Sequence, residues 1–143
     1  MKYPFHSALN SSAEEADFSF SGIKTAVVNL MHNAAQKGEA LSKADIAASF
    51  QRAVCDTLTL KAVHAAKEHG FNTLALAGGV SANRALRSSL ALACEEQGIR
   101  FCCPDFRYCT DNAAMIACAG HYALMTGELS GLDLNAAPDL ELV

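Results

Sequence analysis

One stretch of the sequence, residues 74–84, constrains the fold more than any other. A short apolar run there ends at Gly78 and Gly79, and a helical pattern follows at once. A buried strand that passes through a Gly-Gly turn into a helix presents free backbone N–H groups, which can face an anionic or polar ligand. Neither glycine has a Cβ atom, so a ligand can approach the backbone closely, and Asn83 adds an amide with both a donor and an acceptor.

A plainer interpretation of the same residues has to be weighed beside this one. Many strand–turn–helix junctions carry glycine only to form the turn. An asparagine at a helix start often does no more than accept hydrogen bonds from free backbone N–H groups. From residues 74–84 alone, a turn with a capped helix is the favoured interpretation of Gly78, Gly79 and Asn83, ahead of a binding site.

Apolar periodicity predicts the elements around this turn. Ser42, followed three residues later by Asp45, is a variant of the capping box and predicts the start of the longest helix. Phe18 and Phe20 alternate with serines, as in a short half-buried strand. The predicted strands cover residues 18–21, 73–77 and 99–103, and the predicted helices cover 22–37, 42–69, the region around 86–94, and 111–125.

The start of the last helix matters for the site. Thr110 is the expected N-cap, which places Asp111 in the first turn. The order strand, helix, strand, helix indicates an α/β layer with a parallel pair of strands. No repeat and no linker interrupts the pattern, so we expect residues 1–143 to form one segment of a single domain.

Composition narrows the classes of function. The 143 residues carry a net charge of −4 and no run of lysine or arginine. Composition alone therefore argues against nucleic-acid binding by this segment. We find no signal peptide and no apolar run long enough to span a membrane. The six cysteines include no Cys-x-x-Cys pair, which favours free thiols in a reducing cytosol over the alternatives of disulfides or zinc binding.

Three motifs, taken together and in order, carry a family resemblance. They are residues 17–25 (DFSFSGIKT), 74–84 (LALAGGVSANR) and 110–117 (TDNAAMIA), and the tail 132–136 (LDLNA) adds to them. The chain resembles the C-terminal portion of the tRNA N6-adenosine threonylcarbamoyltransferase family, formerly called the O-sialoglycoprotein endopeptidase or glycoprotease family. The resemblance covers residues 17–143. It implies a helix-rich part of the actin-like, Hsp70-like and sugar-kinase-like ATPase fold, namely the latter part of its second domain.

The resemblance also implies an activity. Members transfer a threonylcarbamoyl group from threonylcarbamoyl-AMP to N6 of the adenosine beside the anticodon of tRNA. A cytoplasmic enzyme is implied, with tRNA, a paralogous partner subunit and an ATPase as partners and no membrane. Gly78, Gly79 and Asn83 would contact the adenylate, and Asp111 would be one ligand of a divalent metal, Fe²⁺ in preference to Zn²⁺. No residue stands out as a catalytic base, and we assign none.

The metal site is incomplete in this sequence. The family's other ligands are two histidines on one helix, and His64 and His69, five residues apart, lie on different helical faces. Without the family, the sequence favours the interpretation of Asp111 as an acid stabilised by the helix dipole, an effect of about 0.3–1 kcal/mol. The alternatives to part of a transferase are a non-catalytic nucleotide- or protein-binding remnant and a metallopeptidase, as in the older family label.

Overall fold

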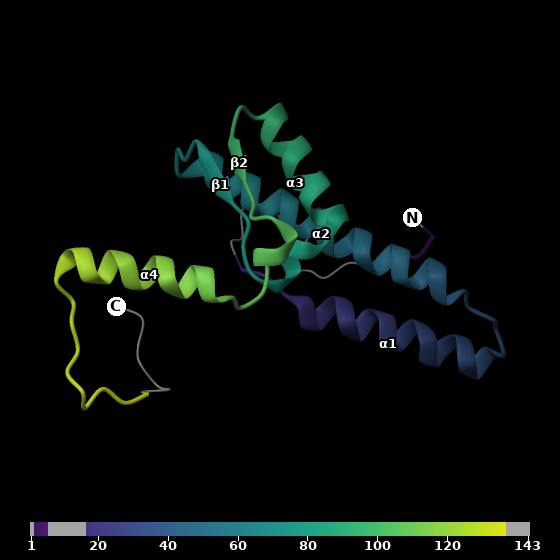
Figure 1. The fold of residues 1–143 in the computed structure, drawn as a ribbon. Helices are drawn as coiled ribbons and strands as arrows, with labels where there is room; N and C mark the ends of the chain where they lie inside the picture. The colour runs from purple at the N-terminus through teal and green to yellow at the C-terminus, as the bar shows by residue number, and fades with distance from the viewer. Residues whose placement is uncertain (1, 6–16, 137–143) are drawn as a thin grey trace. The chain divides into compact units, whose positions relative to one another are not determined.

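The computed structural model describes residues 2–5 and 17–136 and divides the chain into two compact units, Met1–Cys109 and Thr110–Val143. Figure 1 shows the elements of both units in chain order. The first unit contains α1 (Phe20–Lys37), α2 (Lys43–Glu68), β1 (Thr73–Ala75), the short 3₁₀ helix η2 (Gly79–Ala82), α3 (Arg84–Glu96), β2 (Arg100–Cys102) and the 3₁₀ helix η3 (Phe106–Tyr108). The second unit contains α4 (Ala113–Thr126).

The long helix α2 organises the first unit, since α1, β1 and α3 pack along it (Figure 1). Its first half packs against α1 through a cluster of buried side chains, Phe5, Ile23, Ile46 and Ala53. Its second half packs against α3 and the strands. The side chains buried there are Cys55, Val63, Ala66, Leu86, Leu90, Cys94 and Ile99.

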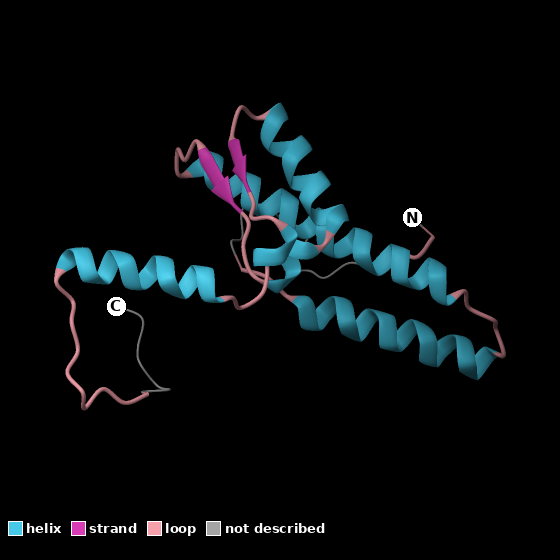
Figure 2. Cartoon of the chain, viewed as in Figure 1, coloured by secondary structure: helices cyan, strands magenta, loops and turns pink. Residues whose placement is uncertain are grey.

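The strands β1 and β2 form the parallel pair that the sequence predicted (Figure 2). Leu74 lies opposite Phe101, and the Leu76 N–H donates to the Cys102 carbonyl at 2.9 Å. The prediction that residues 73–77 are buried was wrong in part, because Leu74 is half-buried while Thr73 and Ala75 are exposed. The buried side faces α2 and α3, whereas parallel sheets are ordinarily covered on both faces.

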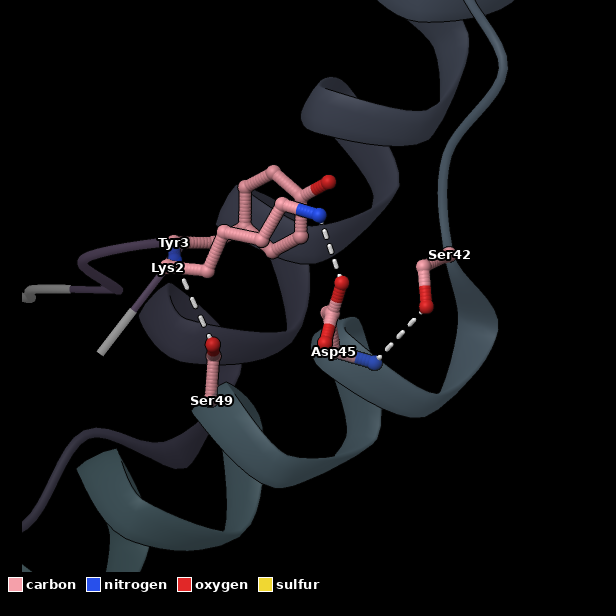
Figure 3. Close-up of polar contacts among 5 residues, drawn as sticks. All are labelled: Lys2, Tyr3, Ser42, Asp45 and Ser49. Atoms are coloured by element: carbon pink, nitrogen blue, oxygen red, sulfur yellow. Dashed lines mark hydrogen bonds and ion pairs between the residues drawn. The ribbon is translucent and has the colours of Figure 1, made fainter.

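The start of α2 confirms the predicted cap and holds the N-terminal segment in place (Figure 3). Ser42 Oγ accepts a hydrogen bond from the Asp45 N–H at 3.2 Å. Lys2 Nζ lies 2.6 Å from Asp45 Oδ2, and the Tyr3 N–H donates to Ser49 Oγ at 3.2 Å. The hydrogen bond between Lys2 and Asp45 lowers the pKa of the Asp45 carboxyl and raises that of the Lys2 ammonium.

The strand predicted at residues 18–21 was wrong. Asp17, Phe18 and Ser19 have no regular structure, and α1 begins at Phe20 with Ser19 as its N-cap residue. Among the described residues only β1 and β2 form a sheet, so residues 18–21 have no strand to pair with. Lys61 of α2 instead donates from Nζ to the Asp17 carbonyl at 2.5 Å.

The predicted start of the last helix was also wrong. Asn112, not Thr110, is the N-cap of α4, and its Oδ1 accepts from the Met115 N–H at 3.0 Å. Asp111 therefore precedes the cap and lies outside the first helical turn. No helix within residues 2–5 and 17–136 is long and apolar enough to cross a membrane.

Candidate functional site

The turn between β1 and α3 has a backbone that only glycine adopts readily. Gly78 has φ 81° and ψ 176°, a region almost closed to residues with a Cβ atom. The chain then makes one 3₁₀ turn, in which the Ser81 N–H donates to the Gly78 carbonyl at 3.0 Å and the Asn83 N–H to the Val80 carbonyl at 2.9 Å. Gly78 is thus required by the turn itself, as the plainer interpretation of the sequence held.

The backbone conformation that requires a glycine at position 78 is absent at Gly79. Its φ lies outside the left-handed region, and a Cβ atom built there would meet nothing within 4 Å. The fold of this chain therefore does not explain a glycine at this position. Bare backbone at the start of a helix, facing open space, suits close approach of a ligand.

Asn83 is the N-cap of α3. Its Oδ1 accepts hydrogen bonds from the Ala85 N–H at 3.0 Å and the Leu86 N–H at 3.2 Å. Its amide nitrogen makes no hydrogen bond with any residue that the structure describes, so the Nδ2 donors remain for a ligand. The capping and binding interpretations therefore use different atoms of the same side chain.

Arg87 holds the turn through hydrogen bonds to its backbone and to the segment after β2. The sequence did not predict this structural role. Its guanidinium donates to the Ser81 carbonyl at 2.5 Å, to the Pro104 carbonyl at 2.6 Å and to Cys109 Sγ at 3.1 Å. Ser81 is fully buried, and its Oγ has no hydrogen-bond partner among the described residues. Arg87 thus ties the turn to the segment after β2. From the sequence, Arg87 was equally a surface charge or a contact for an anion.

Asp111 lies in the second unit, just before the cap of α4. Its side chain is exposed and makes no hydrogen bond or ion pair with the described residues of that unit. Because it precedes the cap, it does not occupy the first-turn position on which the helix-dipole interpretation was based. The Asn112 side chain holds the backbone beside it, donating from Nδ2 to the Thr110 carbonyl at 2.9 Å.

The side chains of the described residues do not make a complete metal site. Within residues 2–5 and 17–136, no three histidine, cysteine, aspartate or glutamate side chains cluster as metal ligands would. One carboxylate is too few ligands for Zn²⁺ or Fe²⁺. All six cysteines are free thiols, and the pKa values of the Cys55 and Cys94 thiols are raised by burial. We therefore derive no chemistry through a metal from this chain alone.

Together these features define a class, an α/β protein in which a strand, a glycine turn and a capped helix form a candidate site for a polar ligand. A model of the family described as tRNA N6-adenosine threonylcarbamoyltransferase matches residues 2–118. A relative of that name from Caldicellulosiruptor saccharolyticus is 46% identical over 142 residues, which are 99% of this chain and 41% of the relative. Another, from Staphylococcus aureus, is 47% identical over 126 residues, 88% of this chain and 37% of the relative.

The chain belongs to the tRNA N6-adenosine threonylcarbamoyltransferase family. It spans about two fifths of the length of these curated relatives and corresponds to their C-terminal part. The resemblance found in the three motifs is therefore confirmed at the level of the family.

Proposed function

We propose that this chain is the C-terminal part of a cytoplasmic enzyme that transfers a threonylcarbamoyl group from threonylcarbamoyl-AMP to N6 of the adenosine beside the anticodon of tRNA. The family match over residues 2–118 is the observation that carries the proposal. The full enzyme would adopt the actin-like ATPase fold and act with a paralogous subunit and an ATPase.

Within that enzyme, we assign the adenylate contact to the turn between β1 and α3. Gly79 offers open backbone, and the Nδ2 donors of Asn83 have no partner among the described residues, while its oxygen caps the helix. An amide donor at a helix start suits a ribose hydroxyl, a base edge or a phosphate oxygen. Asp111 would be the one metal ligand that this chain supplies, to Fe²⁺ in preference to Zn²⁺, with the other ligands in the part of the relatives that it does not span.

The exposure of one sheet face supports placing this chain within a larger protein. Among the described residues of the first unit, helices cover one face of β1 and β2, although the alternation of leucine and alanine in residues 74–77 leaves no polar face. Such an apolar strand is typical of a sheet covered on both sides. Parts of the full enzyme outside the first unit would provide the second cover.

The adenylate contact is tested in the full-length protein with a variant of Asn83 that keeps the oxygen capping α3 and loses the amide donors. Serine caps helices about as well as asparagine, so Asn83→Ser is expected to keep the free energy of unfolding within about 0.5 kcal/mol. Since it removes the amide donors, binding of AMP as a probe, measured by calorimetry, is expected to weaken about tenfold, in line with one lost hydrogen bond. Transfer to tRNA should fall with it.

Gly79→Ala provides an independent variant. The new methyl group meets no atom of the described residues within 4 Å, so stability should hold or rise by about 0.4–1 kcal/mol. A weakened affinity for AMP would then reflect a ligand against the backbone. Unchanged AMP binding in both variants would show that the turn is not part of the adenylate site. Full-length protein that leaves a substrate tRNA unmodified in the presence of its partners would contradict the proposed activity.

A further inference from the structure

Arginine and aromatic side chains gather at one place on the first unit. Arg84 and Arg87 lie at the start of α3, with their guanidinium carbons 5.7 Å and 4.1 Å from the centre of the Phe106 ring. The Arg107 guanidinium carbon lies 4.5 Å from the centre of the Tyr108 ring. We call these residues the arginine–aromatic patch. It holds three of the chain's five arginines, although the chain carries a net charge of −4.

Arg84 occupies a position that folding alone does not favour. The positive end of the helix dipole lies at the first turn of α3, where a cation costs about 0.3–1 kcal/mol and an acid would be stabilising. Among the described residues Arg84 makes no hydrogen bond or ion pair, and its recorded contact is the one with Phe106. A residue that breaks a local rule without a compensating bond is expected at functional sites.

Phe106 is likewise placed for contact and not for burial. The ring is 51% exposed, although it lies within reach of two arginines. Arg87, which is held by the Ser81 and Pro104 carbonyls, fixes the ring from one side. The exposed part of the ring is therefore open to a second flat group, which can stack on it.

Charge around the patch is uneven. Asp105 Oδ2 lies 3.8 Å from the Arg107 guanidinium, so Arg107 is partly neutralised. Arg87 donates to backbone carbonyls and sulfur, which leaves Arg84 as the cation of the patch that has no hydrogen bond or ion pair among the described residues. A ligand that fits this arrangement has one negative group near Arg84 and one flat ring against Phe106.

We propose that the arginine–aromatic patch binds an unpaired nucleotide of RNA, with the base stacked on Phe106 and a backbone phosphate paired with Arg84. Proteins recognise single-stranded RNA by stacking bases on aromatic and arginine side chains beside a positive charge. The inference rests on the proposed function, which makes tRNA the substrate, and it adds where this chain touches that RNA. It also refines the sequence-based argument from composition, since a local patch can bind RNA on a chain of negative net charge.

The test compares matched variants of the full-length protein in equilibrium binding to a substrate tRNA, followed by fluorescence anisotropy at several salt concentrations. Arg84→Gln is compared with Arg52→Gln, an exposed arginine on α2, and Phe106→Leu with Phe71→Leu, a ring that is 64% exposed elsewhere. Arg84→Gln should weaken binding and reduce the slope of log K against log salt by about 0.7–0.9, the contribution of one phosphate. Phe106→Leu should weaken binding about tenfold and leave that slope unchanged.

The two control variants are expected to bind tRNA as the unmodified protein does, and all four should bind AMP normally. The inference is overturned if each patch variant behaves as its control, or if AMP binding falls in place of tRNA binding, which would assign the patch to the adenylate. Protein that modifies tRNA while the patch variants match their controls refutes the inference and leaves the proposed function standing. If the full-length protein without substitutions neither binds nor modifies tRNA, both the inference and the proposed function are refuted.

Discussion

The helices α3 and α4 begin alike and differ in everything that follows. Each is capped by an asparagine whose Oδ1 accepts from backbone N–H groups, and they are 13 and 14 residues long. In α3, Leu86, Leu90 and Cys94 recur at every fourth residue, and all three are buried. In α4 no residue is buried, although its sequence contains no aspartate, glutamate, lysine or arginine.

The difference shows that α3 carries its own packing surface while α4 depends on elements outside its unit. A helix with a single apolar stripe packs on one side, whereas one that is apolar on all sides is typically buried on all sides. Within the described part of the second unit, α4 is the only regular element, so nothing there can cover it. We expect other parts of the full-length protein to surround α4, because this chain spans only about two fifths of its relatives.

The largest expected effect comes from removing one leucine from each helix of the 143-residue chain. Leu86 is 2% exposed, so Leu86→Ala should lower the free energy of unfolding by about 2–5 kcal/mol through lost contacts and a cavity. Leu124 is 61% exposed, and Leu124→Ala should change it by less than about 0.5 kcal/mol. Urea unfolding measures both.

The same pair of variants in the full-length protein sharpens the comparison. There Leu124→Ala should also cost about 2–5 kcal/mol, because α4 is then covered. Equal losses in the 143-residue chain would mean that α4 is already packed within it. A negligible loss in the full-length protein would mean that α4 stays exposed throughout.

Much of the first unit could be predicted because its signals are local. The cap at Ser42 and the apolar steps along α2 predicted that helix to within about one residue of each end. The prediction failed where a pattern was short or ambiguous. Two alternations at Phe18 and Phe20 do not distinguish a strand from a helix entry. Thr110 and Asn112 are both good caps, and only the reach of Asn112 Oδ1 to the Met115 N–H decides between them.

The candidate site shows the same limit. A strand leading to Gly78 and a helix starting near Asn83 were readable from the sequence, because glycine and asparagine have strong positional preferences. The role of Arg87 could not be predicted from the sequence. Its partners are backbone carbonyls 6 and 17 residues away, and any residue type can supply a carbonyl. Nor could the sequence separate the capping oxygen of Asn83 from its free nitrogen.

A smaller effect concerns the thiols of the two helices. Cys94 in α3 is 0% exposed and its pKa is raised by burial, so little of it is in the reactive thiolate form. Cys118 in α4 is exposed. With N-ethylmaleimide near neutral pH, Cys118 should react faster than Cys94 by a factor on the order of 10³ or more, because Cys94 reacts only when α3 opens. Mass spectrometry of timed samples gives both rates.

Denaturant provides the control for this prediction. In urea above the unfolding transition, the two cysteines should react at similar rates. Fast modification of Cys94 in the folded chain would mean that α3 detaches readily from α2, which would remove the distinction between the two helices. Slow modification of Cys118 would show that α4 is covered.

The smallest expected effect is a dependence on pH that the starts of α3 and α4 should lack. The asparagine caps of both helices do not titrate, whereas α2 has Asp45 in its first turn beside Lys2. The pKa of Asp45 is lowered from its ordinary value of 3.8, so its contribution to stability is complete above that value and is lost as the pH falls through the lower pKa of the folded chain. The pKa of Lys2 is raised from 10.5, so its contribution is complete below that value and is lost as the pH rises through the higher pKa of the folded chain.

Both side chains are exposed, so solvent screens the pair and the contribution is small. Asp45→Asn keeps the backbone N–H that bonds Ser42 and removes only the charge. Urea unfolding should show a slightly less stable variant near neutral pH. The difference from the unmodified chain should shrink below pH 3.8, because the carboxyl is then protonated first in the unfolded chain and, at lower pH, in the folded chain. A difference that stays constant with pH would mean that Asp45 acts through packing and not through charge. The start of α2 would then be independent of pH, like the starts of α3 and α4.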